Sequence, residues 1–175
     1  MVALTFASPA QTRRFARVLA RLLQSPALVT IEGDLGTGKT TLVRAILRAR
    51  GVRGAVTSPS FTLAQSYHGR QGEVLHHLDL YRLSRGVDVD LFAWDDYLGA
   101  HAVTFVEWPA AGNGVLPAAD VRLELLHRTP RSRLARLHAS AAFEQAAAEG
   151  AAAEGIEVAA PETGELAAAV PRGAS

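Results

Sequence analysis

The stretch Gly33-Asp-Leu-Gly-Thr-Gly-Lys-Thr-Thr41 decides the fold of this chain, because it satisfies the pattern G-x-x-x-x-G-K-[ST]. In this pattern the backbone N–H groups of a glycine-rich loop cradle phosphates, the lysine reaches the β- and γ-phosphates, and the hydroxyl binds Mg²⁺. Lys39 is the only lysine among 18 basic residues. Its compact ammonium can follow a moving phosphate, whereas a planar guanidinium would crowd the loop. The stretch therefore predicts a phosphate-binding loop.

The segments on either side of the loop predict a strand and a helix. Residues 27–32 (ALVTIE) form a short apolar, β-branched run typical of a buried parallel strand. After the loop, Leu42, Ala45 and Ile46 share one helical face, and Gly51 suits a helix stop. A helix that begins in the loop directs its N-terminal amides and positive dipole end toward phosphates. This context disfavours the alternative, an accidental match in an arginine-biased composition.

Length and composition predict a single domain. At 175 residues, the chain is long enough for one α/β domain with a substantial core and too short for two. It has no cysteine, which excludes a disulfide framework and a thiolate metal site. The N-terminus lacks the basic-then-apolar pattern of a secretory signal, and arginines interrupt the apolar stretches well short of a membrane span. We expect a cytoplasmic protein with no membrane contact.

Other periodic segments complete the expected architecture. Ser8, Pro9 and Gln11 combine a cap residue, a proline at the first helical position and a glutamine suited to a capping box. The expected elements are a helix over 9–24, strands over 61–68 and 73–79, a short helix over 90–98, a buried strand over 102–107, and edge strands over 121–128 and 132–140. The four-residue connection 69–72 favours an antiparallel hairpin. The predicted fold is therefore a P-loop NTPase-like α/β domain whose mixed parallel and antiparallel sheet is flanked by helices.

Charge is distributed unevenly along the chain. The formal net charge is +1, but residues 141–175 contain six Glu and one Arg and carry −5, which leaves +6 on residues 1–140. A basic body suits phosphate-rich partners, although the arginines of the first helix are interpreted as an ordinary exposed face. The apolar residues after position 140 are too scattered to predict a core. We therefore expect an ATPase domain over 1–140 and a largely disordered acidic tail over 141–175, so that deleting 145–175 should change stability little.

Two acidic residues follow apolar strands and are candidate metal ligands. Asp79 follows VLHHL and Glu107 follows VTFV. In nucleotide-hydrolysing proteins Mg²⁺ is commonly held by a loop hydroxyl and by a carboxylate at the end of a neighbouring strand. A solvated strand end or a helix cap is the alternative for each acid, and the phosphate loop favours the metal role for at least one. His76 and His77 are not expected to bind metal, because adjacent strand residues face opposite sides of a sheet.

Several segments, in order, resemble the signatures of a known protein family. They are residues 33–41, 57–63 (TSPSFTL), 77–82 (HLDLYR) and 106–109 (VEWP), the last followed by 115–117 (VLP). Together they resemble the TsaE family, formerly YjeE, over about residues 8–139. The resemblance implies a weak, Mg²⁺-dependent P-loop ATPase required for threonylcarbamoyladenosine modification of bacterial tRNA.

The resemblance also implies a role for each matched residue. Thr40 and Glu107 would hold Mg²⁺, and Asp79 would assist the metal or position water. Trp108 would be the family's functional tryptophan, a position that sequence alone would assign to core packing. The expected nucleotide-binding residues are Leu35, Gly36, Thr37, Gly38, Lys39, Thr40, Thr41 and Arg133. A switch-like loop facing the γ-phosphate would contain Ser58, Pro59, Ser60 and Phe61, with Ser60 in place of the family's usual threonine.

The implied cofactors are ATP and Mg²⁺, and the implied partners are TsaD and TsaB homologues. The chain would couple hydrolysis to their turnover without transferring the threonylcarbamoyl group, and its tRNA contact is expected to be indirect. A P-loop small-molecule kinase is the main alternative, but such enzymes usually close an arginine-bearing lid over the transferred phosphate. The sequence shows no insert of that kind between Gly51 and Asp120. A nucleotide-gated adaptor with negligible catalysis is a third possibility.

Overall fold

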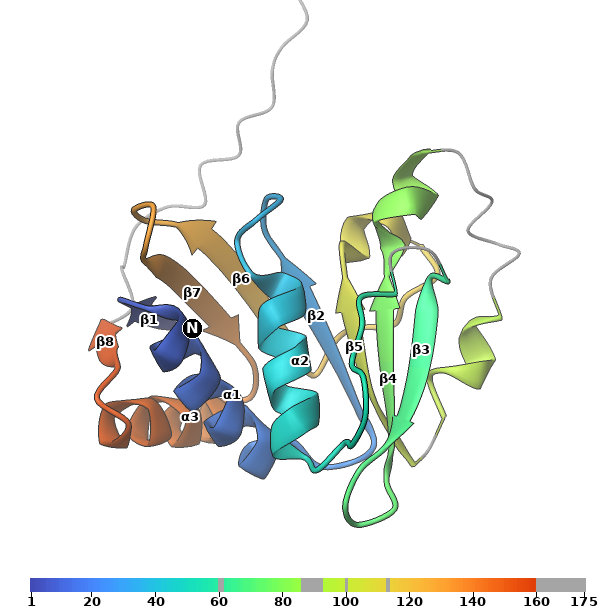
Figure 1. The fold of residues 1–175 in the computed structure, drawn as a ribbon, viewed down its shortest axis with the longest axis horizontal. Coiled ribbons are helices and arrows are strands. Elements are labelled where there is room, and N and C mark those ends of the chain that lie inside the picture. Colours follow the sequence, from blue (N-terminus) through green and yellow to red (C-terminus); the bar gives the residue numbers. More distant parts are fainter. Residues whose placement is uncertain (60–61, 86–92, 100, 113, 160–175) are drawn as a thin grey trace, which may run out of the picture.

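An eight-stranded sheet forms the centre of the protein, in the order β3-β4-β5-β2-β6-β7-β1-β8 (Figure 1). The computed structural model describes residues 1–59, 62–85, 93–99, 101–112 and 114–159. Neighbouring strands in the series β4, β5, β2, β6 are parallel, and the remaining pairs are antiparallel. The strands are β1 (Val2–Phe6), β2 (Ala27–Glu32), β3 (Ala64–His68), β4 (Val74–Asp79), β5 (Ala102–Glu107), β6 (Val121–His127), β7 (Arg133–His138) and β8 (Glu157–Ala159). The mixed sheet predicted from the sequence is confirmed.

Helices cover one face of this sheet. They are α1 (Pro9–Leu22), α2 (Lys39–Ala49) and α3 (Ala141–Ala153), and their apolar residues form one core with the inner sides of β1, β2, β5, β6 and β7. A smaller core on Leu28, Leu78 and Val106 includes residues of the 3₁₀ turns η1 (Leu80–Arg85) and η3 (Trp94–Asp96). Among the described residues, no helix is both long enough and apolar enough to cross a membrane.

Local sequence signals locate most of these elements. Ser8 caps α1, with Oγ accepting a hydrogen bond from Gln11 N, and Pro9 is the first helical residue. The helix ends at Leu22, two residues before the predicted end. The hairpin of β3 and β4 is antiparallel, as its short connection predicts. Of the helix expected over 90–98, residues 90–92 lie outside the described residues, and the described part forms only the η3 turn.

The prediction that β6 and β7 are edge strands is wrong. Each is paired on both sides, β6 between β2 and β7, and β7 between β6 and β1. Both strands alternate buried and more exposed residues because their inner side packs on the helices and their other side is only partly covered. Alternation therefore indicates a half-covered face and says nothing about position in the sheet. Strand β1, which was not predicted, is one of these neighbours.

The prediction of a disordered tail is wrong for residues 141–159. Ser140 caps α3 by accepting a hydrogen bond from Phe143 N, and Ala147, Ala151 and Ile156 are buried in the main core. A Cβ on Gly150 would lie 2.6 Å from Val18 Cγ1, so glycine allows α3 to approach α1 closely. Strand β8 then pairs with β1. The domain thus extends to residue 159, and residues 160–175 lie outside the described residues.

Deleting residues 145–175 is therefore expected to destabilise the protein, contrary to the prediction from sequence. The deletion removes Ile156 and two buried alanines from the core, a loss of about 3–5 kcal/mol from the buried apolar area alone. Urea unfolding of the truncated and full-length chains measures the difference. A chain ending at residue 159 is the matched control, because it keeps every contact that the structure describes. Equal stability of the two truncated chains would contradict a structural role for α3 and β8.

Candidate nucleotide-binding site

The glycine-rich loop lies between β2 and α2, with its backbone shaped by glycines. Gly33, Gly36 and Gly38 have φ of 134°, 79° and 103°, values that residues other than glycine rarely adopt. At Gly33 the chain also passes close to β6, since a Cβ there would lie 2.1 Å from Leu125 O. Gly38 caps α2 without a side-chain hydrogen bond. The first amides of α2 therefore have no side-chain cap, an arrangement that suits an anion.

Lys39 points back into this loop. Its Nζ donates hydrogen bonds to Gly33 O at 2.6 Å and to Asp34 O at 2.9 Å, and the side chain is buried. The ammonium also lies 3.9 Å from the centre of the Trp108 ring. Burial lowers the pKa of Lys39, while the nearby carboxylates of Glu107, Asp79 and Asp34 oppose that shift. The ammonium is thus held where phosphates would meet the loop.

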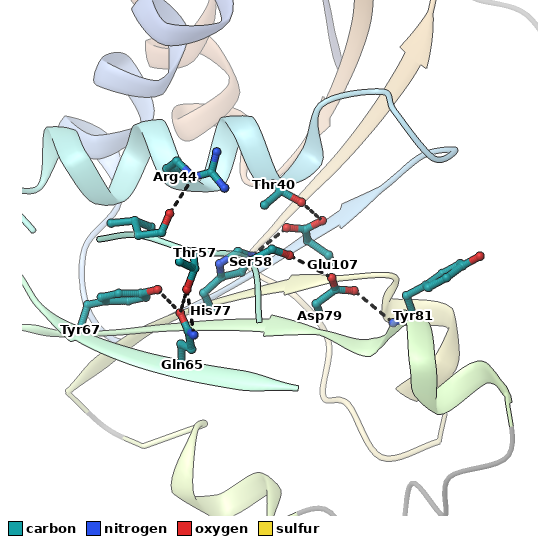
Figure 2. A network of polar contacts seen from close by, with 11 residues as sticks. Thr40, Arg44, Thr57, Ser58, Gln65, Tyr67, His77, Asp79, Tyr81 and Glu107 are labelled. Atoms are coloured by element: carbon teal, nitrogen blue, oxygen red, sulfur yellow. Dashed lines mark hydrogen bonds and ion pairs between the residues drawn. The ribbon is translucent and has the colours of Figure 1, made fainter. Parts of the chain in front are cut away.

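The two candidate acids lie side by side at the ends of parallel strands. Asp79 ends β4 and Glu107 ends β5, and the two residues are register partners. Figure 2 shows Thr40 and His77 directed at Glu107. Thr40 Oγ1 donates to Glu107 Oε2 at 2.9 Å, so the loop hydroxyl and a strand-end carboxylate, 67 residues apart, meet directly. Both acids are buried.

Asp79 contacts a different part of the structure. Its Oδ1 accepts a hydrogen bond from Tyr81 N at 3.2 Å, and its Oδ2 lies 3.5 Å from Ser58 Oγ (Figure 2). Glu107 therefore meets the phosphate loop, whereas Asp79 meets the segment predicted to be switch-like. Pro59 follows Ser58 in that segment, and the predicted residues Ser60 and Phe61 lie outside the described residues.

His77 is a site residue that the sequence analysis missed. It is fully buried, and its Nε2 lies 2.7 Å from Glu107 Oε1. With Thr40 on Oε2, both carboxylate oxygens of Glu107 have a partner. The alternation of side chains along a strand could have indicated this role. His77 lies two residues before Asp79 and therefore on the same face of β4. His76 faces the other side, where its Nδ1 contacts Ser66 Oγ at 2.8 Å.

A pair of histidine variants tests whether His77 positions Glu107. His77→Ala and His76→Ala each remove a buried, hydrogen-bonded side chain, so both should destabilise the protein by about 2–4 kcal/mol in urea unfolding. Only His77→Ala leaves Glu107 Oε1 without its partner, so only this variant should weaken Mg²⁺-dependent ATP binding, by about 10-fold or more. Calorimetric titration of ATP with and without Mg²⁺ measures this. Equal Mg²⁺ dependence in both variants would contradict the positioning role.

Trp108 and Arg133 contact different residues of the loop motif. Trp108 has φ of 59°, and its half-buried ring packs on Tyr81 with centroids 4.9 Å apart. Arg133 Nε donates to Thr37 O at 3.0 Å, and its second terminal nitrogen donates to Gly36 O at 3.2 Å. Arg133 was predicted from the family to reach the nucleotide. In this structure it holds the carbonyls of the loop.

A cavity of about 790 Å³ brings most of the predicted residues together. Its lining consists of Leu35, Gly36, Gly38, Lys39, Thr40, Thr41, Asp79, Tyr81, Arg82, Glu107 and Trp108. Thr37 and Arg133 instead line a second cavity of about 610 Å³, which shares Gly36, Gly38 and Thr41 with the first. The first volume is within the range usual for small-molecule sites. Its edge of the sheet, at the carboxyl ends of parallel strands, is where such folds bind ligands.

The donor set fits Mg²⁺ bound together with phosphates better than a metal held by protein alone. Among the described residues, no three or more His, Cys, Asp or Glu side chains form a group that could hold a metal ion. Mg²⁺ usually keeps several waters and takes only one or two carboxylates plus the phosphates of a substrate. The contact between Thr40 and Glu107 supplies a hydroxyl and a carboxylate of that kind.

Comparisons with known proteins identify the family of this chain. A family model described as "Threonylcarbamoyl adenosine biosynthesis protein TsaE" matches residues 6–135. Relatives named "tRNA threonylcarbamoyladenosine biosynthesis protein TsaE" include one from Haemophilus influenzae, 37% identical over 65% of this chain and 72% of its own. One from Streptomyces coelicolor is 45% identical over 55% of this chain and 66% of its own. One from Treponema pallidum is 35% identical over 67% of this chain and 86% of its own.

A solved structure shows the same fold. The crystal structure of Bacillus subtilis YdiB superposes with a TM-score of 0.69 at 24% identity, and the match covers 89% of this chain and 98% of YdiB. The family model spans both the glycine-rich loop and the two strand-end acids. The chain therefore belongs to the TsaE family of threonylcarbamoyladenosine biosynthesis proteins.

Proposed function

We propose that this protein binds ATP with Mg²⁺ at the edge of the sheet formed by β2, β4 and β5 and hydrolyses it slowly. The observation that carries the proposal is the 2.9 Å contact between Thr40 Oγ1 and Glu107 Oε2. It joins the hydroxyl of a phosphate-binding loop to a buried carboxylate, which is the pair that Mg²⁺ requires in this class of protein. Lys39 and the amides of residues 35–41 would bind the phosphates.

The chain's own residues suggest how hydrolysis is assisted. Mg²⁺ would supply positive charge there, which would neutralise negative charge that develops on the phosphates. Thr40 and Glu107 would hold the ion, and His77 fixes the second oxygen of Glu107. Asp79, through its contact with Ser58, orients the switch-like loop and the attacking water. Trp108 covers Lys39 and limits access of solvent to it.

We further propose that the chain acts in the cytoplasm, in tRNA threonylcarbamoyladenosine modification, as a subunit that works with TsaD and TsaB homologues. The family membership supports the pathway, because relatives from three organisms carry that name. The family resemblance supports the partners. In this role ATP hydrolysis drives turnover of the complex, and the chain does not transfer the threonylcarbamoyl group itself.

ATPase rates with and without partners test the proposal and separate it from its alternatives. The isolated chain should hydrolyse ATP slowly and only with Mg²⁺, and addition of TsaD and TsaB homologues should raise the rate. A rate raised by a small-molecule acceptor and not by these proteins would favour the kinase alternative. ATP binding with no hydrolysis under any of these conditions would favour the nucleotide-gated adaptor.

A further inference from the structure

Two rows of arginine line a groove on the helical face of the protein. Helices α1 and α2 pack side by side (Figure 1), and neither contains an acidic residue. Arg13 and Arg17 of α1, with Arg44 and Arg48 of α2, are exposed along this seam. They line a groove of about 360 Å³, which we call the arginine groove, together with Thr41, Ala45 and Ala49.

The spacing within each row repeats along the groove. Residues four apart lie one above the other on a helix, separated by about 6 Å along its axis. Arg44 Nε donates to Val56 O at 2.8 Å, and one terminal nitrogen of Arg48 donates to Val52 O at 3.3 Å, so both are held in place. Arg17 forms an ion pair with Glu154 at 3.2 Å. The groove thus presents ordered guanidinium groups from both sides.

Like charges so close together cost free energy in the isolated protein. An anion in the groove removes that repulsion, so this arrangement favours a multiply charged ligand. The ligand would lie beside the nucleotide cavity, because Thr41 lines both.

The residues that line the arginine groove favour a phosphate backbone over an acidic protein surface. Protein interfaces usually have aromatic or large apolar residues at their centre. The groove has only threonine and alanine between its arginines, so it offers no such anchor. Guanidinium groups bind phosphate in a bidentate manner and are suited to a repeating phosphate backbone. We propose that the arginine groove binds the phosphodiester backbone of RNA, a direct contact in place of the indirect one expected from the sequence.

Salt dependence of RNA binding tests the proposal without relying on ATP hydrolysis. The probe is a fluorescently labelled single-stranded RNA, followed by anisotropy with the nucleotide site filled by Mg²⁺ and ADP so that RNA cannot occupy the phosphate loop. Four phosphate contacts predict that log K falls against log salt with a slope of about −3. The double variant Arg13→Gln, Arg17→Gln should reduce the slope to about −1.5 and weaken binding by about 10-fold at moderate salt.

Controls make the result specific to this groove. Arg122 is an exposed residue of β6, and its neighbours Val121 and Leu123 pack in the main core beneath the helices. Arg122 therefore faces the other side of the sheet, away from α1 and α2, and Arg122→Gln should leave binding unchanged. Thermal unfolding should change little and basal ATPase activity should be unchanged in the double variant, because both substituted residues are exposed and the Arg17–Glu154 ion pair lies at the surface. Binding that is insensitive to the double variant, or equally reduced by Arg122→Gln, would overturn the proposal. Tighter binding of labelled poly-glutamate than of RNA would overturn it in favour of an acidic protein partner.

Discussion

Lys39→Ala is expected to weaken ATP binding by about 100-fold or more while the domain stays folded. The ammonium would lose at least two charge-assisted hydrogen bonds to phosphate, each contributing about 1.5–3 kcal/mol. In the free protein its partners are the carbonyls of Gly33 and Asp34, which belong to the loop. The free energy of unfolding should therefore change by only about 1 kcal/mol. Calorimetric ATP titration and urea unfolding measure the two effects separately.

Lys39→Arg is expected to be nearly as damaging, although it preserves the charge. The centre of the Trp108 ring lies 3.9 Å from Nζ, and two carbonyl oxygens of the loop lie within 2.9 Å of it, so a larger planar head has no equivalent position. Arg53→Lys provides a control, because it exchanges the same two head groups in reverse at an exposed position. ATPase activity near that of the unmodified protein in Lys39→Arg would contradict our interpretation of the single lysine.

Glu107→Gln should keep ATP binding in the absence of metal but raise the Mg²⁺ concentration needed for hydrolysis by about 10-fold to 100-fold. The amide has nearly the shape of the carboxylate and lacks the charge that a hard cation requires. The direct contact of Glu107 with Thr40 is the structural reason to expect this effect at Glu107. A titration of Mg²⁺ against ATPase rate measures it.

Asp79→Asn is the matched comparison, because it makes the same chemical change at the register partner on β4. Asp79 contacts Ser58 and the Tyr81 amide, so this variant should lose maximal rate with a smaller change in metal requirement. The reverse pattern would assign the metal-binding role to Asp79. It would also make the segment that begins at Glu107 part of a switch or a partner surface.

Features set by neighbouring residues could be predicted from the sequence. The strand, loop and helix around Lys39 follow from a local pattern, and Asp79 and Glu107 could be chosen as candidate acids because each follows an apolar run. The contact of His77 with Glu107 depends on the register between β4 and β5, which no local pattern determines. Likewise, Arg133 meets the loop only because β7 lies near it in the folded sheet.

The C-terminal segment was misjudged for a different physical reason. Alanines give a weak apolar signal, and their burial depends on how closely two helices approach. That approach is made possible by Gly150 against Val18, a contact between residues far apart in the chain. Ile156, the large apolar residue of this segment that is buried, follows the helix and so is not part of its periodic pattern, and Phe143 is only partly buried.

The position of β1 has a consequence for the order of assembly during synthesis. This strand is synthesised before the other strands of the sheet, yet Leu4 pairs with Ala135 on one side and with Val158 on the other. Both contacts close almost the whole described chain into a loop, and such non-local pairing forms slowly. Strands β2, β4 and β5 can meet while translation continues. Both edges of the apolar strand β1 instead stay unpaired until the later strands have been synthesised. An unpaired strand edge can pair with another chain, so aggregation is most favoured in this state.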